Sequence, residues 1–568
     1  GTNIDMTRAF TAGSGGFYGD VWGASGFDPV GDSIANPFTG GLDGQGHTIS
    51  GLTINRAGER DVGLFGYTQY AFVSDLAFSG GSITGNQGVG ALAGEFNGGT
   101  ITSVSSNIPV EGSEFVGGLV GASQNLTAIS LSSASGDVSG SGYAAGGLIG
   151  ALFEGTISRS YATGNVSGDS LVGGLVGANG FASGGGTIDQ SFATGYVTGS
   201  ASEIGGLVGH LEGIITNSYA TGNVTGTGAA EQIGGFVGSL GAPASIDGAY
   251  STGMVTGPSQ VGGFAGFNDG DGSNITSAYW NTETSGQASG IANGSGDIIG
   301  RTTSELQGRL PAGFSNTIWA TDTNLFPYFS WLYPGGANAV SGFAYSDDGT
   351  TALTGAEIGI VSGGSFLGGT GTGANGYYYY LALPGNIDPD GALAYLDGEA
   401  THGAAFSDVA GTNGVQNLDI YGPSLNLTTG EATLSDTLAN LATTLDSYTD
   451  TDVDFIDAGS TQVTATGQGL YIDAASNYTL DQDLTSGGVL SLTSGGIFTI
   501  GADRTLKTTG SGSIVVNSGF SWSGASKLTL NADDNIALNG ALDGKNGGLT
   551  LLASGTGGSD NTGTISTE

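Results

Sequence analysis

Short apolar phrases recur along the first half of the chain at a nearly constant spacing. Phrases of the type VGGLVG occur eight times between residues 61 and 266, and their last glycines lie 27 to 32 residues apart. Two other phrases, of the types GTIS and SYATGNV, stand between most copies, and turn-forming Gly, Asn, Ser and Asp separate all three. None shows the i, i+3, i+4, i+7 spacing of an amphipathic helix. The pattern predicts an all-β fold, a β-solenoid (parallel β-helix) with three-strand coils of about 28 residues.

One aromatic position recurs with the same period. If the coils stack in register, a single column contains Tyr161, Phe192, Tyr219, Tyr250 and Tyr279. In one interpretation this column is a structural ladder, in which each pair of neighbouring rings contributes about 0.5–1.5 kcal/mol. In the other interpretation it is a strip that binds sugar rings. The sequence leaves both open.

The repeated phrases resemble a known family. The anchor G-[LF]-[VIA]-G followed by S-[YF]-A-T-G-x-V is similar to the GLUG repeat of large bacterial surface proteins of the filamentous-haemagglutinin type. Residues 279–287, 302–306 and 326–334 resemble the segment that closes such an array, and 38–54 resembles the first coils of many parallel β-helices. The resemblance implies a secreted, surface-associated stalk or adhesin and supplies no catalytic residues.

The repeat ends near residue 334, and a different pattern follows. Alternating apolar residues and Asp-Gly or Asn-Gly turns in 339–425 predict a sandwich of short antiparallel strands. The spacing of glycines and apolar residues in this segment resembles the carboxypeptidase-regulatory-like, or prealbumin-like, modules that act as spacers on surface proteins. We therefore expect a β-sandwich between two other parts of the chain.

The last third begins with a helical pattern and returns to strands. Leucines at spacings of 4, 3 and 4 in 432–448 predict a short helix that connects to the next element. From about residue 460 apolar runs recur, with KLTL and GLTL 21 residues apart. They resemble haemagglutinin-type repeats of proteins exported by two-partner secretion and predict a second, slimmer β-helix. Because no polar element follows the last coil, we expect a longer rod or a covering subunit.

These patterns divide the chain into five parts. We expect N-terminal β-helix coils, a GLUG-repeat β-solenoid with its closing segment, a prealbumin-like β-sandwich, a connector with a short helix, and a haemagglutinin-type β-helix. Their respective bounds are 1–60, 61–334, 335–425, 426–459 and 460–568.

Composition and charge narrow the function. Fifty acidic and 10 basic residues give a net charge of −40, which excludes nucleic-acid binding because that needs clustered Lys and Arg. The acids either keep a long surface repelling and dissolved, or bind divalent cations. The chain contains no run of 18 apolar residues, so its sequence predicts no membrane span. It contains no cysteine, which excludes disulfides and thiol metal sites. We expect an extracellular or cell-surface location.

Calcium is the one ligand ion that the sequence suggests. Asp269, Asp271 and Ser273 stand at alternate positions in a glycine-rich segment, the spacing of oxygen ligands in calcium loops. The alternative is an ordinary solvated turn. Asp452, Asp454 and Asp457 form a similar cluster, and we expect no other cofactor.

Catalysis finds little support in the sequence. When the repeats are aligned, Ser158 and Thr216 stand at the position of Asp189 in neighbouring coils. The acidic residues of the repeats therefore form no column. The three histidines lie far apart, without the spacings of metalloprotease or serine-hydrolase motifs. We expect no enzyme, although parallel β-helices also host polysaccharide-acting enzymes that use paired carboxylates.

Two non-catalytic functions remain. In the first, the chain is the rigid stalk and binding surface of a secreted bacterial adhesin that attaches to surface glycans or matrix. In the second, it is a structural subunit that self-associates end to end into an extracellular filament, by strand addition at open sheet edges.

Overall fold

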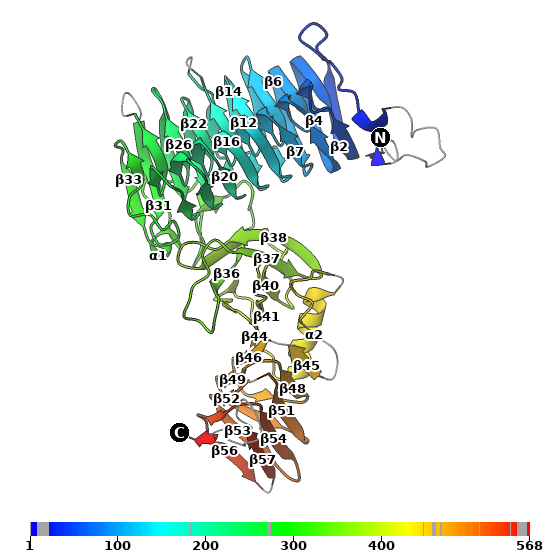
Figure 1. Ribbon diagram of the computed structural model, residues 1–568, viewed down its shortest axis with the longest axis vertical. Coiled ribbons are helices and arrows are strands. Elements are labelled where there is room, and N and C mark those ends of the chain that lie inside the picture. The colour runs from blue at the N-terminus through cyan, green and yellow to red at the C-terminus, as the bar shows by residue number, and fades with distance from the viewer. Residues whose placement is uncertain are drawn as a thin grey trace. The chain divides into compact units, whose positions relative to one another are not determined.

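The chain folds into two compact units, Gly1–Leu332 and Tyr333–Glu568, each built mainly of β-strands (Figure 1). The structure, a computed structural model, describes residues 2–7, 22–181, 184–269, 274–446, 448–456, 462–465, 468–510, 512–545, 547–553 and 565–567. The prediction of an all-β fold with a parallel β-solenoid is confirmed.

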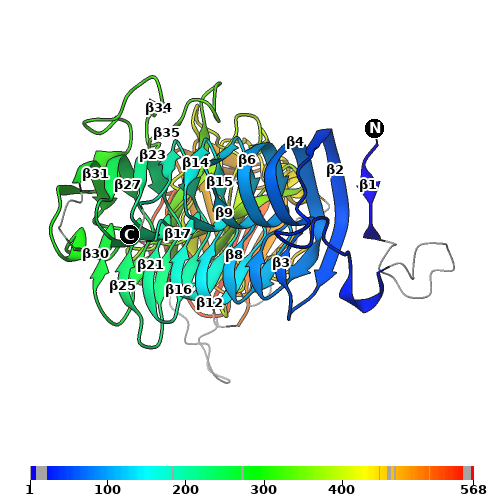
Figure 2. The ribbon, with the colours of Figure 1, turned by 90° about the horizontal axis from the view of Figure 1, so that it is seen from above.

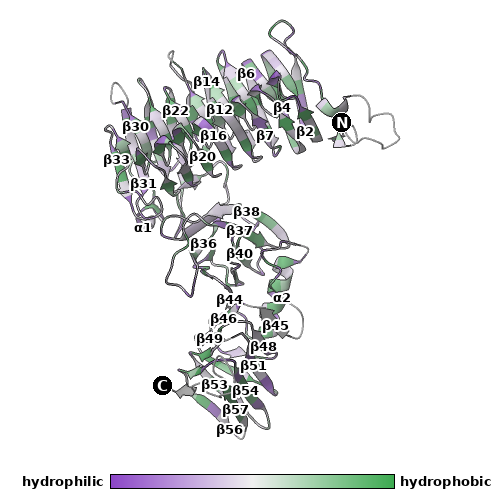
Figure 3. Cartoon of the chain, viewed as in Figure 1, coloured by the Kyte–Doolittle hydropathy of each residue, from purple (hydrophilic) through white to green (hydrophobic). Residues whose placement is uncertain are grey.

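The first unit contains a solenoid whose strands, up to residue 301, pair in parallel, coil upon coil. Pairing is in register with the repeat, since Ile204 aligns with Ile233 and Ile233 with Val261. Figure 2 shows β3, β8, β12, β16, β21 and β25 following one another along the solenoid. The apolar residue of each repeat points inward, and one core extends from Met6 to Trp280. Figure 3 shows the resulting hydrophobic bands recurring from strand to strand.

Three sets of strands form most of this solenoid, together with the long strands of its first coils, which are β2 (Gly41–Asn55), β4 (Phe65–Thr84) and β6 (Ala93–Ser106). The first set, which precedes the bend of each anchor phrase, is β3 (Arg60–Val62), β5 (Gln87–Val89), β8 (Glu114–Gly117), β12 (Val138–Gly146), β16 (Val166–Gly173), β21 (Ser202–Gly205), β25 (Glu231–Gly234) and β29 (Val261–Gly262). The second set, which follows the bend, is β9 (Val120–Gln124), β13 (Ile149–Leu152), β17 (Val176–Asn179), β22 (Val208–Leu211), β26 (Val237–Leu240) and β30 (Ala265–Asn268). The third set is β10 (Thr127–Ser130), β14 (Gly155–Ser158), β18 (Thr187–Asp189), β23 (Ile214–Ala220), β27 (Ser245–Ser251) and β31 (Asn274–Asn281).

The anchor phrase is a bend between two strands, whereas the sequence suggested one strand. In one copy β16 ends at Gly173 and β17 begins at Val176. A Cβ atom on Gly173 would lie 2.0 Å from the carbonyl oxygen of Val176, so only glycine allows this turn. The last glycine of the next copy, Gly209, also lies too close to the coil before it for a side chain, because its Cβ would lie 2.5 Å from the carbonyl carbon of Leu171. The repeated glycines are therefore required by backbone contact.

A column of buried serines supports the corner next to the third set. The hydroxyl of Ser160 donates to the carbonyl of Ser158 at 2.9 Å and accepts from the amide of Ser132 at 3.2 Å. Ser191 repeats both contacts one coil further, and its hydroxyl accepts from the amide of Ser160 at 3.2 Å. Each serine thus satisfies a backbone amide that the bend removes from the regular ladder.

The closing segment consists of a short helix and two paired strands, α1 (Thr303–Leu306), β34 (Trp319–Ala320) and β35 (Tyr328–Phe329). Thr302 caps α1, with its hydroxyl accepting from the amide of Glu305 while the Glu305 carboxylate accepts from the Thr302 amide. Figure 2 shows β34 and β35 beside β23, so the chain turns back over coils that it has already built.

The second unit starts with a sandwich of short strands. Within it β36 (Asn338–Tyr345) pairs antiparallel with β39 (Tyr377–Ala382), and β37 (Glu357–Ser362) pairs antiparallel with β38 (Ser365–Gly371) and β40 (Ala392–Leu396). The predicted antiparallel pattern is not complete, because β36 also pairs in parallel with β42 (Gly414–Gln416) and β43 (Ile420–Tyr421).

A slimmer solenoid of three-strand coils follows without a break in hydrogen bonding. β44 (Ser424–Thr429) pairs in parallel with β41 (Ala404–Ser407) of the sandwich on one side and with β46 (Gly469–Ala474) on the other. The expected border near residue 425 therefore falls inside a strand. The ladder that starts there continues through β49 (Leu490–Ser494), β52 (Ile514–Val516), β55 (Ile536–Leu538) and β58 (Ile565–Thr567).

Two further ladders complete these coils. One contains β45 (Gln462–Ala465), β48 (Asp483–Ser486), β51 (Arg504–Thr508), β54 (Lys527–Ala532) and β57 (Gly548–Ala553). The other contains β47 (Tyr478–Thr479), β50 (Ile497–Ile500), β53 (Gly519–Ser523) and β56 (Leu542–Lys545). The KLTL and GLTL phrases pair as the sequence suggests, with Leu528 opposite Leu549.

The predicted helix is α2 (Leu434–Leu445), capped by Thr433. Its leucines Leu434, Leu438 and Leu441 are buried in one core with residues of the sandwich and of the slim solenoid, among them Tyr395 and Leu470. The helix therefore closes the side of this junction.

Candidate functional site

The structure brings the five residues of the aromatic column together. Ring centroids lie 4.8 Å apart for Tyr161 and Phe192, 4.7 Å for Phe192 and Tyr219, and 5.1 Å for Tyr219 and Tyr250. These rings are parallel to within 9°. Tyr279 follows in register opposite Tyr250.

The closing segment covers most of this column. Trp319 packs on Tyr219 and Tyr250, with centroids 6.0 and 5.9 Å away. The Tyr250 hydroxyl donates to the carbonyl of Pro327 at 2.6 Å, and the Tyr279 hydroxyl donates to that of Ala312 at 2.9 Å. Because Tyr219, Tyr250 and Tyr279 are at most 3% exposed, these rings offer no free face to a sugar. The column's geometry is that of a structural ladder.

Only one of the three residues in the calcium motif is described. The carboxylate of Asp269 accepts a hydrogen bond from the amide of Ala242 at 3.3 Å. Asp271 and Ser273 lie outside the described residues, as does Asp457 of the second cluster. Calcium binding at Asp269 therefore stays a prediction.

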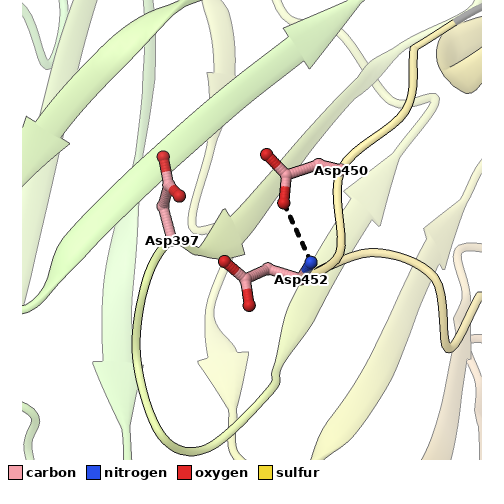
Figure 4. Close-up of side chains that lie close together, drawn as sticks. All are labelled: Asp397, Asp450 and Asp452. Carbon is pink, nitrogen blue, oxygen red and sulfur yellow. Dashed lines mark hydrogen bonds between the residues drawn. The ribbon is translucent and has the colours of Figure 1, made fainter.

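A group of three carboxylates lies in the second unit, and the sequence singled out only one of them, Asp452. Oxygen atoms of Asp397, Asp450 and Asp452 all lie within 4.8 Å of one another, and Figure 4 shows the three side chains converging. The amide of Asp452 donates to Asp450 at 2.9 Å, and the amide of Gly398 donates to Asp452 at 2.7 Å. The group joins the loop after β40 to the segment after α2, more than 50 residues away in sequence.

The three carboxylates of this group repel one another. Burial raises the pKa of Asp397, and the carboxylates of Asp450 and Asp452 raise it further. The Nδ1 atom of His402 lies 3.3 Å from Asp452. Carboxylate oxygens are ligands that calcium accepts, but protonation of a carboxylate also relieves this repulsion, so the arrangement alone defines no metal site.

A second cluster lies on the outer face of the first unit, beside the bends of four consecutive coils. We call it the lateral patch, and its members are Phe115, Tyr143, Phe153, Phe181, Glu203, His210 and Glu212. Phe115, Tyr143 and Glu203 come from β8, β12 and β21, before the bend. The other four lie in or directly after β13, β17 and β22, beyond the bend.

The aromatic part of the lateral patch centres on Phe181. Its ring centroid lies 5.6 Å from Tyr143, 5.4 Å from Phe153 and 6.3 Å from His210. Phe115 contacts Tyr143 and Phe153 edge-on. Underneath, Phe115 and Phe181 rest on a small apolar cluster made of Ala144, Leu171 and Ala178. The rings are half-buried apart from Tyr143, which is 42% exposed.

The charged part of the lateral patch is a histidine between two glutamates. His210 Nδ1 lies 3.1 Å from Glu203, and Nε2 lies 3.5 Å from Glu212. Burial lowers the pKa of His210, but the hydrogen bonds and negative charges of both glutamates outweigh burial and raise it. The pKa of the Tyr143 hydroxyl is raised by burial and by the same two carboxylates, so the phenol stays protonated.

This patch was not predicted from the sequence. One signal was present, namely the 32-residue step between Gly177 and Gly209, the longest in the array. Three residues separate Leu152 from Thr156, whereas seven separate their partners Asn179 and Thr187. Phe181 belongs to this insertion.

The fold and the repeat together define a class, the all-β solenoids with GLUG motifs. The GLUG motif family matches this chain at residues 141–167 and 200–225. These two segments of the first unit are therefore similar to the GLUG motif, and they include Tyr143, Glu203, His210 and Glu212 of the lateral patch.

Two curated proteins are similar over short stretches. Halomucin of Haloquadratum walsbyi is 42% identical over 113 residues, which is 19% of this chain and 1% of that protein. A "Putative Gly-rich membrane protein" of Evansella cellulosilytica is 38% identical over 90 residues, 16% of this chain and 10% of that protein. The chain thus spans a small part of the relatives it matches. Both similarities are compatible with a cell-surface or extracellular protein.

One solved structure shares limited similarity. A protein of Bacteroides ovatus, described as a "putative immunoglobulin A1 protease", aligns with 58% of this chain and 84% of its own, at 19% identity and a TM-score of 0.31. A likeness of this size carries no argument about activity.

In the part of the chain that the structure describes, no helix is both long and apolar enough to cross a bilayer.

Proposed function

We propose that this chain is a non-catalytic segment of a secreted or cell-surface rod that attaches its cell to a surface. Support comes from the GLUG motifs and from two relatives, one named halomucin and the other a Gly-rich membrane protein. The finer assignment, to filamentous-haemagglutinin-type adhesins exported by two-partner secretion with a prealbumin-like spacer, rests on the sequence resemblance and belongs to the proposal.

The observation that carries the proposal is the uninterrupted core of the first unit. One apolar cluster links Met6 to Trp280 through stacked coils. A close-packed core of this kind resists bending, while each coil presents its outer side chains at a fixed spacing of about 4.8 Å. Stiffness together with a regularly spaced outer surface is what a stalk with lateral attachment points needs.

The test is an attachment assay. Fluorescent beads that carry the purified chain at defined density are allowed to settle on polysaccharide-coated glass, and retained beads are counted under flow. We expect retention well above that of beads carrying an unrelated acidic protein of equal charge density. Equal retention of the two bead populations on every coating would refute the attachment function.

A second function, polymerisation into a filament, has one observation in its favour. β57 is the last described strand of its ladder, which runs from β45 through β54. Its side chains Leu549 and Leu552 are 42% and 51% exposed. Exposed apolar residues on such a strand suit pairing with another chain. Sedimentation velocity in low and physiological salt, with and without millimolar calcium, distinguishes the two functions, because a filament subunit elongates without a ligand and an attachment rod stays monomeric.

A further inference from the structure

We propose that the lateral patch is a binding site for a sugar chain that carries no negative charge. This inference names the class of ligand that the proposed attachment function would use. Only the biological role of the site depends on that proposed function. The binding itself stands on the geometry of the patch. The patch combines stacked aromatic rings with two carboxylates that flank a histidine.

The first argument is the shape of the patch. Phe115 and Glu203 stand three strand spacings apart, because β8, β12, β16 and β21 pair in sequence. At about 4.8 Å per spacing the patch extends about 14 Å along the solenoid. This length suits several sugar units in a row.

The second argument is that the fold does not require these side chains. In the column of His210 the neighbouring coils carry Ala178 and Ser239. In the column of Tyr143 the next coil carries Ser170. The backbone therefore accepts small or polar residues at these positions. The core positions, in contrast, carry similar apolar residues from coil to coil. Side chains that depart from the repeat need another explanation.

The third argument is the insertion that supplies Phe181. Four extra residues between Asn179 and Thr187, relative to the coil before, place one more ring against Tyr143, Phe153 and His210. Insertions in repeat proteins form loops on one face, often the binding face. Here the insertion extends an aromatic surface that already exists.

The chemistry of the patch selects the ligand. Apolar ring faces such as that of Tyr143 can cover the C–H face of a sugar. Glu203 and Glu212 each have about four acceptor positions, and contact with His210 uses only part of them, so sugar hydroxyls can donate to the rest. Two carboxylates around one imidazole leave a net negative site. Anionic sugars are repelled, while neutral and amino sugars are accepted.

The experiment measures binding of the full chain to soluble hexasaccharides by isothermal titration calorimetry. The probes are cellohexaose, chitohexaose and a chitosan hexamer, with an oligogalacturonate of equal length as the anionic comparison. We expect binding of at least one uncharged or amino probe and none of the anionic one. Tyr143→Ala and Phe181→Ala are each expected to weaken that binding at least tenfold.

Tyr70→Ala is the matched control, because Tyr70 is a tyrosine of the same solenoid, 60% exposed and outside the lateral patch. Its affinity should equal that of the unchanged chain. Thermal unfolding of all three variants checks that the coils stay folded, and Glu212→Gln provides a milder variant if an aromatic substitution destabilises them. Lack of binding by every uncharged and amino probe, or equal affinity in Tyr143→Ala and Tyr70→Ala, would overturn the inference.

The same variants separate this inference from the proposed function. If beads attach equally well with and without Phe181→Ala, attachment stands and uses another surface. If hexasaccharides bind but beads are not retained on any coating, the site stands and the attachment function fails.

Discussion

Single glycines decide whether two coils of the first unit can stack. At the end of each anchor phrase the backbone of one coil touches the backbone of the coil before it, and at Gly209 a Cβ would lie 2.5 Å from the carbonyl carbon of Leu171 and 2.6 Å from the carbonyl oxygen of Gly177. Backbone atoms on both sides cannot rotate away as a flexible side chain can. The repeated glycine is thus a packing requirement.

Gly209→Ala is expected to lower the free energy of unfolding of the first unit by about 3 kcal/mol or more, since overpacking against backbone is not relieved by rotamer changes. Gly58→Ala is the control, because no atom lies within 4 Å of the Cβ it would carry, and its effect should stay within about 0.5 kcal/mol. Urea unfolding followed by tryptophan fluorescence measures both. Equal effects of the two substitutions would contradict the close-contact explanation.

Another feature at the residue scale is Glu95, whose carboxyl group favours the protonated form in the folded protein. Burial, followed by the charge of Asp61, raises the pKa of Glu95 to about 7, although Arg60 and a hydrogen bond with Tyr67 act in the opposite direction. The folded state therefore binds a proton more tightly than the unfolded state, in which the pKa is 4.5. The contribution of Glu95 to stability is therefore fully present below pH 4.5 and is lost as the pH rises through about 7.

Glu95→Gln should remove this part of the pH dependence. In the unchanged protein, Glu95 should lower the free energy of unfolding by about 2 kcal/mol between pH 4.5 and 7.5, a value that takes its partial exposure into account. Melting temperatures at four pH values across this range give the measurement. Glu114→Gln, at an exposed position of the neighbouring coil, should keep the original slope, and a slope that persists in Glu95→Gln would exclude Glu95 as its source.

At the scale of elements, the closing segment gives the last coils a second layer. β34 and β35 fold back over β23 and β27, and Trp319 contacts Phe314 and Phe329 of its own segment as well as two rings of the aromatic column. Trp319 is 1% exposed. Trp319 is therefore a central contact between the closing segment and the solenoid.

Trp319→Ala should detach the closing segment before the coils unfold, at a cost of about 3–5 kcal/mol for a large buried ring. The readout is limited trypsin digestion, because Arg309 lies within this segment and is one of only 10 basic residues in the chain. Cleavage there should become faster by at least tenfold. Trp331→Ala, which changes a half-buried ring outside the column, should have a smaller effect, and unchanged cleavage in Trp319→Ala would show that other contacts hold the segment.

Elements that repeat could be predicted from the sequence, and elements that do not repeat could not. The register of Tyr161, Phe192 and Tyr219 follows from identical phrases, since like residues stack when coils have equal length. Nothing local indicates that Trp319 covers Tyr219, because 100 residues separate them and no repeated phrase links them. The anchor bend was also missed, since apolar and glycine letters alone do not distinguish a strand from a tight corner.

The lateral patch illustrates the same limit. Its members occupy different positions in successive coils, so aligning the repeats does not bring Tyr143, Phe181 and His210 into one column. The carboxylate group of the second unit was missed for a related reason, as Asp397 stands on a loop of the sandwich and Asp450 beyond α2. Tertiary contacts across non-repeating chain are needed to find both.

At the scale of the whole molecule, each of the two units has hydrophobic core clusters of its own. The core of the first unit ends at Trp280, and the cores of the second unit begin at Val340. Fifty acidic residues against 10 basic ones give both units an outer surface that repels other copies at low salt. We therefore expect the units to unfold as separate cooperative transitions.

Scanning calorimetry at low protein concentration should resolve these two transitions. Leu207→Ala, in the first core, should lower only one of them by about 5 °C, and Leu492→Ala, in the second, should lower only the other. Both leucines are fully buried, which makes the pair matched. A single transition that moves with either substitution would show that the two units unfold together.

The unbroken sheet of the second unit has a consequence for pulling force. β44 is at once the edge of the sandwich and the first rung of the slim solenoid, so its hydrogen bonds join β41 to β46 without an intervening linker. A flexible linker at this point would stretch first under tension and leave both neighbours intact. Here a load that reaches the slim solenoid passes into the sandwich through backbone hydrogen bonds, and α2, buried against both, braces the joint. Under flow, the junction would yield only when strands separate.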